Sequence, residues 1–204
     1  MLKRLTAVLL LLFAAAALAQ APAAGKKPNP GLRPDAGAIT AGVYHNRYFG
    51  FDYQLPAGFD DRTSAMPKDG RGITFALLYI SEPKHQTRVA RSVTLLADDA
   101  IVWKSKDGAA YLDKVNVQMQ AHAGLVGKLL PLEIAGHTFY RQDYQPHAQF
   151  LARQTIVATV IKGYVLSAVL TAGDAAGIDA LLAGVRAMKF NPAKPKTTTS
   201  TPRR

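Results

Sequence analysis

Three predicted strands are apolar on both faces, and this feature constrains the fold most strongly. Residues 73–80, 154–161 and 164–170 place apolar side chains at successive positions, where a half-buried strand would alternate apolar and polar ones. Strands of this kind must be covered on both sides. Lys162-Gly163 joins the last two segments as a two-residue hairpin turn, a link that antiparallel strands allow. A mainly antiparallel central sheet is therefore predicted.

Two predicted helices supply the covering layers. The helices are expected to begin near Asp107 and Asp174, because aspartate is a favoured N-cap residue. Each helix carries apolar residues at helical spacing, namely Tyr111, Leu112, Val115 and Met119 in the first and Ile178, Leu181, Leu182, Val185 and Met188 in the second. The fold class is therefore expected to be α+β, an α/β/α sandwich whose mainly antiparallel central sheet is covered by helices on both faces.

The chain contains no cysteine, so a hydrophobic core must hold the fold without disulfides. Thiol catalysis and thiolate metal sites are excluded for the same reason. Residues 20–38 and 192–204 are poor in large apolar side chains and cannot offset the entropy of ordering. We expect a disordered linker over 20–38, a single domain over 39–191 and a disordered basic tail over 192–204.

Residues 1–19 are typical of a signal peptide. Two basic residues precede an apolar run, and Ala17 and Ala19 form the small-x-small pattern that signal peptidase recognises. The alternative is a permanent membrane anchor, but a transmembrane helix needs roughly 20 apolar residues and this run is shorter. We expect cleavage before Gln20 and a periplasmic or secreted protein with no transmembrane anchor in its mature form.

The formal net charge of +11 is concentrated at the ends of the chain, since residues 39–188 are nearly neutral. Basic ends attract anionic surfaces without specificity. An envelope protein or an anionic surface polymer is therefore the expected partner, and specific binding of nucleic acid is not expected. The alternative is that the ends only increase solubility and have no partner.

An aromatic motif opens the predicted domain. Phe49, Phe51, Tyr53 and Leu55 recur at every second position, which is the period of a strand. A row of aromatic side chains can also form a platform on which sugars or bases stack. Because the period is that of a strand, we assign this row to the core.

The motif resembles the start of PsbP-like domains, whose fold is related to that of the Ran-binding nuclear import release factor. It comprises Tyr44, Asn46, Phe49, Gly50, Phe51, Tyr53, Leu55, Pro56, Gly58 and Phe59. The hairpin at Lys162-Gly163 and the closing Lys189-Phe190 are similar too, so the resemblance covers roughly residues 39–60 and 150–190. It implies a PsbP-like fold. Photosynthetic members are extrinsic photosystem subunits that help to retain manganese, calcium and chloride, whereas many bacterial relatives are exported proteins of unknown role.

The sequence shows no catalytic, cofactor or metal motif. Its histidines lack the spacing of zinc ligands and are expected at the surface or in turns: His45, His85, His122, His137 and His147. The adjacent acids Asp60-Asp61 and Asp98-Asp99 are expected in solvated loops, because neighbours on a strand point to opposite faces. No position matches a metal-retaining site of the PsbP-like proteins. No catalytic residue, metal or cofactor is therefore assigned.

Trp103, Lys104 and Lys106 are the candidate partner surface, since a tryptophan beside two lysines can stack on a ligand or a partner. Half-buried packing of Trp103 at the end of a strand is nevertheless the interpretation that we favour for this residue. The leading functional hypothesis is an exported, noncatalytic binding or assembly module of the bacterial cell envelope. A periplasmic, hydrolase-like enzyme that uses loop acids and histidines is the alternative, and a passive envelope protein whose tails matter most is a third. A cleft lined by His85, Asp98 or Asp99 would favour the enzyme.

Overall fold

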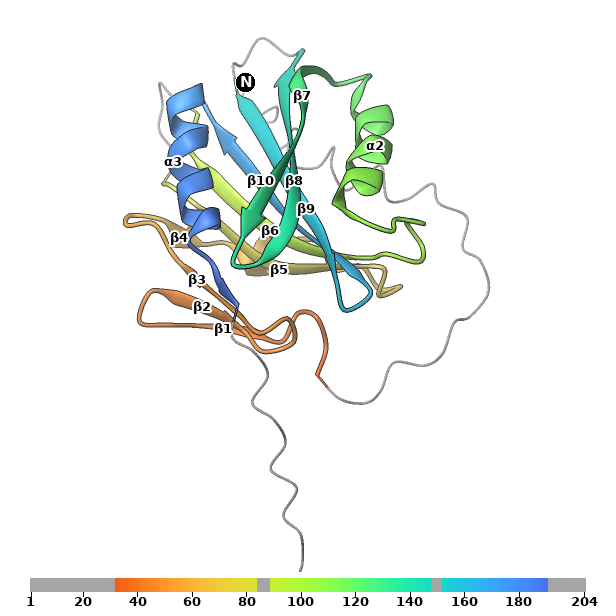
Figure 1. Cartoon of the computed structure of the whole chain (residues 1–204). Coiled ribbons are helices and arrows are strands. Elements are labelled where there is room, and N and C mark those ends of the chain that lie inside the picture. The colour runs from red at the N-terminus through yellow and green to blue at the C-terminus, as the bar shows by residue number, and fades with distance from the viewer. Residues whose placement is uncertain (1–31, 84–88, 148–151, 191–204) are drawn as a thin grey trace, which may run out of the picture.

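The computed structural model describes residues 32–83, 89–147 and 152–190. The predicted signal peptide with its cleavage site at Ala17, Ala19 and Gln20 lies outside the described residues, as do most of the predicted linker and the basic tail. Figure 1 draws these segments as a thin grey trace.

A seven-stranded sheet forms the centre of the molecule (Figure 1), with the strand order β4-β5-β6-β10-β9-β8-β7. Its strands are β4 (Asp60–Asp61), β5 (Thr74–Ser81), β6 (Ser92–Asp99), β7 (Ala123–Ile134), β8 (His137–Pro146), β9 (Arg153–Ile161) and β10 (Tyr164–Ala172). Every pair of neighbours is antiparallel, as the short predicted turns required. Lys162 and Gly163 connect β9 to β10 with φ of 53° and 81°. Two positive φ angles are what a type I′ hairpin turn needs.

The aromatic motif builds a second, four-stranded sheet of its own. This sheet has the order β1-β2-β3-β11 and consists of β1 (Gly37–Thr40), β2 (Val43–Asn46), β3 (Phe51–Gln54) and β11 (Lys189–Phe190). Phe190 pairs with Phe51, so the last described residues close the sheet that the first ones begin. Phe49, Phe51 and Tyr53 are at most 4% exposed, so the predicted role of the aromatic row in the core is confirmed.

Two twelve-residue helices, α2 (Gly108–Met119) and α3 (Ala175–Arg186), pack against the large sheet; a short 3-10 helix, η2 (Thr63–Ala65), follows β4. The predicted N-caps are confirmed, since the side chains of Asp107 and Asp174 accept hydrogen bonds from backbone N–H groups in the first turns. Alternate side chains of β10 enter two separate cores. Leu166 and Leu170 pack under α3 and the small sheet, whereas Val165 and Val169 pack under α2.

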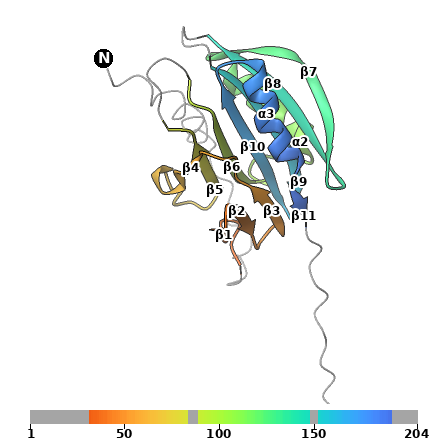
Figure 2. The same ribbon diagram turned by 90° about the vertical axis from the view of Figure 1, so that its left-hand side faces the viewer.

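The predicted α/β/α sandwich is wrong. Strands hold 48% of the described residues and helices 18%, and the strands form two sheets rather than one. Figure 2 shows α3 lying on the large sheet above the small sheet, so this face is shared between a helix and strands. The physical reason is the pairing of β11 with β3, which joins the two ends of the described chain and keeps the aromatic motif out of the central sheet.

Candidate functional site

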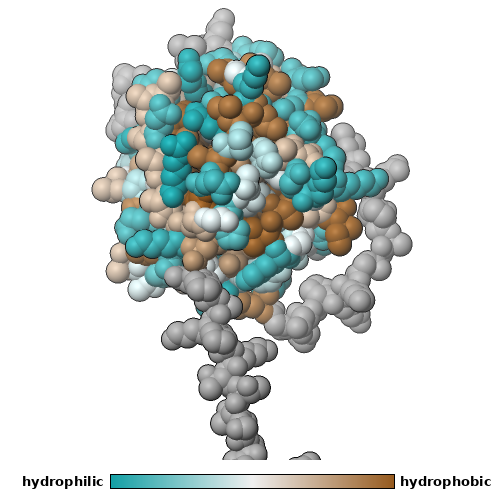
Figure 3. Space-filling model, viewed as in Figure 1, coloured by the Kyte–Doolittle hydropathy of each residue, from teal (hydrophilic) through white to brown (hydrophobic). Residues whose placement is uncertain are grey.

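The loop that connects β6 to α2 carries the predicted partner residues. We call residues 100–107 the β6–α2 loop. Trp103 is half-buried, and its ring centroid lies 4.9 Å from that of Tyr111 on α2. Lys104 and Lys106 are exposed, and within the described ranges their side chains form no hydrogen bond or ion pair. Among the residues that the structure describes, Ile101 is the most exposed large aliphatic side chain, at 81%. Hydrophobic and hydrophilic side chains are interspersed over the face of the molecule in Figure 3.

Hydrogen bonds to α2 and to the β9–β10 turn hold the β6–α2 loop in place. Lys114 of α2 donates through Nζ to the carbonyl oxygens of Trp103 and Lys104 and, at 3.3 Å, to the hydroxyl of Ser105. The backbone N–H of Ala100 donates to the carbonyl of Gly163 in the β9–β10 turn at 3.1 Å. The loop is therefore fastened to α2 on one side and to the sheet on the other.

Two acids at the ends of the loop accept backbone hydrogen bonds, whereas its two lysines are exposed. Asp99 accepts hydrogen bonds through Oδ1 from the N–H groups of Ile101 at 2.8 Å and Val102 at 3.1 Å. Asp107 accepts the N–H of Ala110 at 2.8 Å as the N-cap of α2. Both carboxylates thus satisfy backbone donors, whereas the ammonium groups of Lys104 and Lys106 face solvent. The outer side of the loop combines one aliphatic side chain with two cations.

A buried acid lies directly behind the loop. Asp98 is 3% exposed and accepts the hydroxyl of Thr74 at 2.6 Å and that of Tyr111 at 2.8 Å. Burial raises the pKa of Asp98 to about 6, although the hydrogen bonds from the two hydroxyls favour the ionised form. Burial and the nearby Asp98 carboxylate also raise the pKa of Tyr111 well above its usual value. Tyr111 therefore joins Asp98, through its hydroxyl, to Trp103, through its ring.

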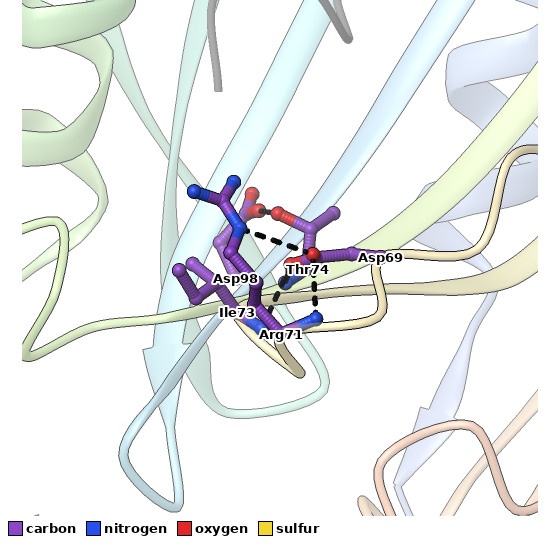
Figure 4. A network of polar contacts seen from close by, with 5 residues as sticks. All are labelled: Asp69, Arg71, Ile73, Thr74 and Asp98. Atoms are coloured by element: carbon purple, nitrogen blue, oxygen red, sulfur yellow. Dashed lines mark hydrogen bonds and ion pairs between the residues drawn. The ribbon is translucent and has the colours of Figure 1, made fainter. Parts of the chain in front are cut away.

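Asp69 extends this polar network toward the turn before β5 (Figure 4). Its carboxylate accepts backbone N–H groups of Arg71, Ile73 and Thr74 at 2.9 to 3.0 Å. Burial alone would raise the pKa of Asp69, but these backbone donors and the Arg71 side chain hold it below its ordinary value. Thr74 bonds to Asp69 through its N–H and to Asp98 through its hydroxyl. The network thus fixes the turn at one end of the sheet.

The adjacent acids differ from the expectation of solvated loops. Asp60 and Asp61 are exposed on β4, as expected. Asp98 is buried within β6, so its predicted position in a solvated loop is wrong. The register of β6 explains the difference, because Asp98 lies opposite Thr74 on β5 and finds a hydrogen-bond donor there. Asp99 is the next residue and caps the loop.

The histidines are dispersed through the described part of the chain. His45 lies 2.7 Å from Asp52 through Nδ1 on the small sheet, and the ring of His137 packs 4.6 Å from that of Phe190. His85 lies outside the described residues. Within residues 32–83, 89–147 and 152–190, no three acids or histidines lie close enough together to hold a metal ion. In the same ranges, no helix has the length and apolar character of a membrane span.

Comparisons with known proteins found similarity only at the level of structure, since no family model and no curated protein matches the sequence. The chain is similar to cyanobacterial PsbP (CyanoP) from Synechocystis, with 13% identity, a TM-score of 0.48, and 82% of this chain and 98% of that chain covered. It is similar to PA94, a protein of unknown function from Pseudomonas aeruginosa, with 16% identity, a TM-score of 0.46, and 74% and 96% covered. It is also similar to LpqN, which is involved in cell envelope biogenesis of Mycobacterium tuberculosis, with 15% identity, a TM-score of 0.43, and 70% and 83% covered. A PsbP protein is thus among the structures that this chain resembles, as the sequence motifs indicated.

Sequence reasoning missed Ile101 as a surface residue. Ala100, Ile101, Val102 and Trp103 form a run that looks like the continuation of a buried strand. The available signal was the pair Asp98-Asp99 just before this run, because an aspartate often ends a strand by bonding to the N–H groups that follow it. Asp99 acts in this way, and the run after it leaves the sheet as a loop.

Proposed function

We propose that the protein is a noncatalytic binding module of the bacterial cell envelope, and that the β6–α2 loop is the surface with which it binds its partner. The observation that carries this proposal is the exposure of Ile101 (81%) on a loop that is fastened at both ends. Removing an isoleucine side chain from water stabilises a complex by about 1.5–3 kcal/mol. A loop that is already ordered loses little conformational entropy when it binds.

The burial of Asp98 and Tyr111, whose pKa values are raised, further supports a binding role. A general acid or base must come within hydrogen-bond reach of its substrate. Asp98 and Tyr111 are 3% and 6% exposed, and they use their oxygens to bond to each other. The network that they form joins α2 to the sheet and supports the loop from behind.

The alternative of a periplasmic, hydrolase-like enzyme also rests on Asp98. Its pKa of about 6 is close to the pH at which such an enzyme would work, and groups of this kind are concentrated at active sites. Catalysis by Asp98 would require the β6–α2 loop or α2 to move away and admit a substrate. We favour the binding role because Lys114 and Tyr111 hold both elements against the sheet.

The envelope location is inferred from the sequence of residues 1–19, which resembles a leader for export. The partner class follows from the outward charges of the loop. Lys104 and Lys106 favour an anionic partner, which an acidic envelope protein, an anionic surface polymer or the anionic surface of a membrane provides.

The proposal is tested by affinity capture from an envelope extract, with two double variants of equal charge change. Lys104→Glu/Lys106→Glu reverses the charge of the loop, and Lys128→Glu/Lys189→Glu does the same at exposed positions of β7 and β11. We expect the loop variant to lose the material that the unmodified chain retains, and the control variant to keep it. Equal retention by both variants would show that the loop is not the binding surface.

A further inference from the structure

We infer that the β6–α2 loop docks on an anionic lipid surface, with Ile101 entering the boundary between headgroups and acyl chains. The inference rests on the proposed binding role of the loop and names its partner. Three properties of the loop carry it: the chemistry of its exposed side chains, the hydrogen bonds of its backbone, and the small number of apolar side chains that it exposes.

The exposed side chains are those that an interfacial segment uses. Ile101 is 81% exposed at the turn, and the half-buried Trp103 follows two residues later. Aliphatic side chains insert at the headgroup boundary, whereas tryptophan prefers the level of the headgroups. Lys104 and Lys106 lie beside them with free ammonium groups, and lysines near an anionic leaflet are attracted to its phosphates.

The backbone N–H groups of residues 101–105 all donate hydrogen bonds within the protein. The N–H groups of Ile101 and Val102 donate to the Asp99 carboxylate, and that of Trp103 donates to the Asp99 carbonyl at 3.0 Å. Lys104 N–H donates to the carbonyl of Ile101 at 3.0 Å, and Ser105 N–H donates to that of Ala100 at 2.9 Å. Unsatisfied backbone groups are costly away from water. Residues 101–105 can therefore leave water without breaking an N–H bond.

The small number of apolar side chains that the loop exposes favours a lipid surface over a protein. A standard interface buries about 800 Å² on each partner and has a packed apolar centre. The β6–α2 loop presents one strongly exposed aliphatic residue on a turn, with Trp103 already packed on Tyr111. A single exposed aliphatic side chain followed by two lysines is a small surface for a protein partner, but it can be inserted between lipid headgroups.

Trp103 makes the inference directly measurable, because it is the only tryptophan of the chain and lies in the loop. The exported chain is titrated with vesicles of phosphatidylglycerol and phosphatidylcholine in equal parts, and with vesicles of phosphatidylcholine alone. We expect the emission of Trp103 to shift to shorter wavelength with the anionic vesicles only. Attraction through the basic residues at 192–204 would bring vesicles close without changing the surroundings of Trp103.

Two matched variants test the insertion. Ile101→Asp should weaken vesicle affinity by about tenfold or more, since a charge replaces the inserted side chain. Val117→Asp changes another exposed aliphatic residue, which is 69% exposed on α2, and should leave the affinity unchanged. Thermal melting of both variants checks that they fold. A third arm replaces the vesicles with inorganic polyphosphate, which carries charge but no apolar phase.

The inference is overturned if Trp103 does not respond to anionic vesicles, if polyphosphate produces the same shift, or if both variants bind vesicles as the unmodified chain does. The outcome is separable from that of the proposed function. If envelope capture depends on Lys104 and Lys106 but the emission of Trp103 does not change with vesicles, the loop is still the binding surface and its partner is a protein or a polymer. If capture does not depend on these lysines either, the binding surface itself is wrong.

Discussion

Asp98 should make the protein more stable as the pH falls from 7 to 5, which is opposite to the usual effect of a paired carboxylate. Its carboxylate is 3% exposed, and burial raises its pKa from the ordinary value of 3.8 to about 6. The perturbation that tests this is Asp98→Asn, which removes the titration and retains two polar atoms that can bond to Thr74 and Tyr111.

The sign follows from the proton affinity of the two states. Because the pKa of Asp98 is higher in the folded state, the folded state binds the proton more tightly. The stabilisation is fully present below pH 3.8 and is lost as the pH rises through 6. The difference between the two pKa values corresponds to about 3 kcal/mol in total. About 1 kcal/mol of this is gained between pH 7 and pH 5. Asp69 acts in the opposite direction, but its pKa is lowered, so its effect falls below this window.

The assay is urea denaturation at pH 7 and pH 5 of the chain from Gln20 onward, of its Asp98→Asn variant and of its Asp113→Asn variant, a control at an exposed position of α2. The unmodified chain and the control should gain about 1 kcal/mol more than Asp98→Asn on acidification. The same pH dependence in all three proteins would refute the reasoning, since Asp98 would then titrate alike in the folded and unfolded states.

Three further predictions concern the helices, the loop and the leader. Gly184→Ala should raise the free energy of unfolding by about 0.5–1 kcal/mol, because an added Cβ there would lie at an ordinary contact distance of 3.5 Å from its nearest atom. Gly177→Ala should lower the free energy of unfolding, because an added Cβ there would lie only 2.7 Å from a side chain of β10. Urea denaturation of both variants measures the two changes. Lys114→Met should lower the free energy of unfolding by about 1–3 kcal/mol, since the carbonyls of Trp103 and Lys104 lose their charged donor. Proteolysis between residues 100 and 106 should become faster for the same reason. An unchanged rate of cleavage would contradict the role of Lys114 in holding the loop. Expression in a bacterium with the complete leader should yield a protein whose N-terminus is Gln20 or within a few residues of it, and an intact mass that retains Met1 would contradict export.

Local chemistry made parts of the fold predictable from the sequence. The N-caps at Asp107 and Asp174 depend on one side chain and the backbone three residues later, and the structure confirms both. The turn at Lys162-Gly163 depends on two adjacent residues and is confirmed as well. The second sheet was missed because it depends on the pairing of Phe190 with Phe51, residues far apart in the chain. Periodicity shows that Phe51 is buried but not which strand lies beside it.

The candidate site was only partly predictable for the same reason. Trp103, Lys104 and Lys106 stood out by residue type, and the structure places them together on one loop. The exposure of Ile101 and the burial of Asp98 depend on where β6 ends, and that point is fixed by Thr74 of β5 and Gly163 of the β9–β10 turn. Neither contact can be read from the sequence around residues 98–101, where the pair Asp98-Asp99 is the signal that the strand ends.

Photo-crosslinking in living cells tests the central claim, that the β6–α2 loop is the binding surface of an exported module. A photoreactive p-benzoylphenylalanine is placed at Ile101 in one variant and at Val117 in another, since both positions are exposed and only the first lies on the loop. Irradiation should produce a defined adduct with an envelope component from position 101 and none from position 117. Adducts of equal yield from both positions, or from neither, would contradict the account.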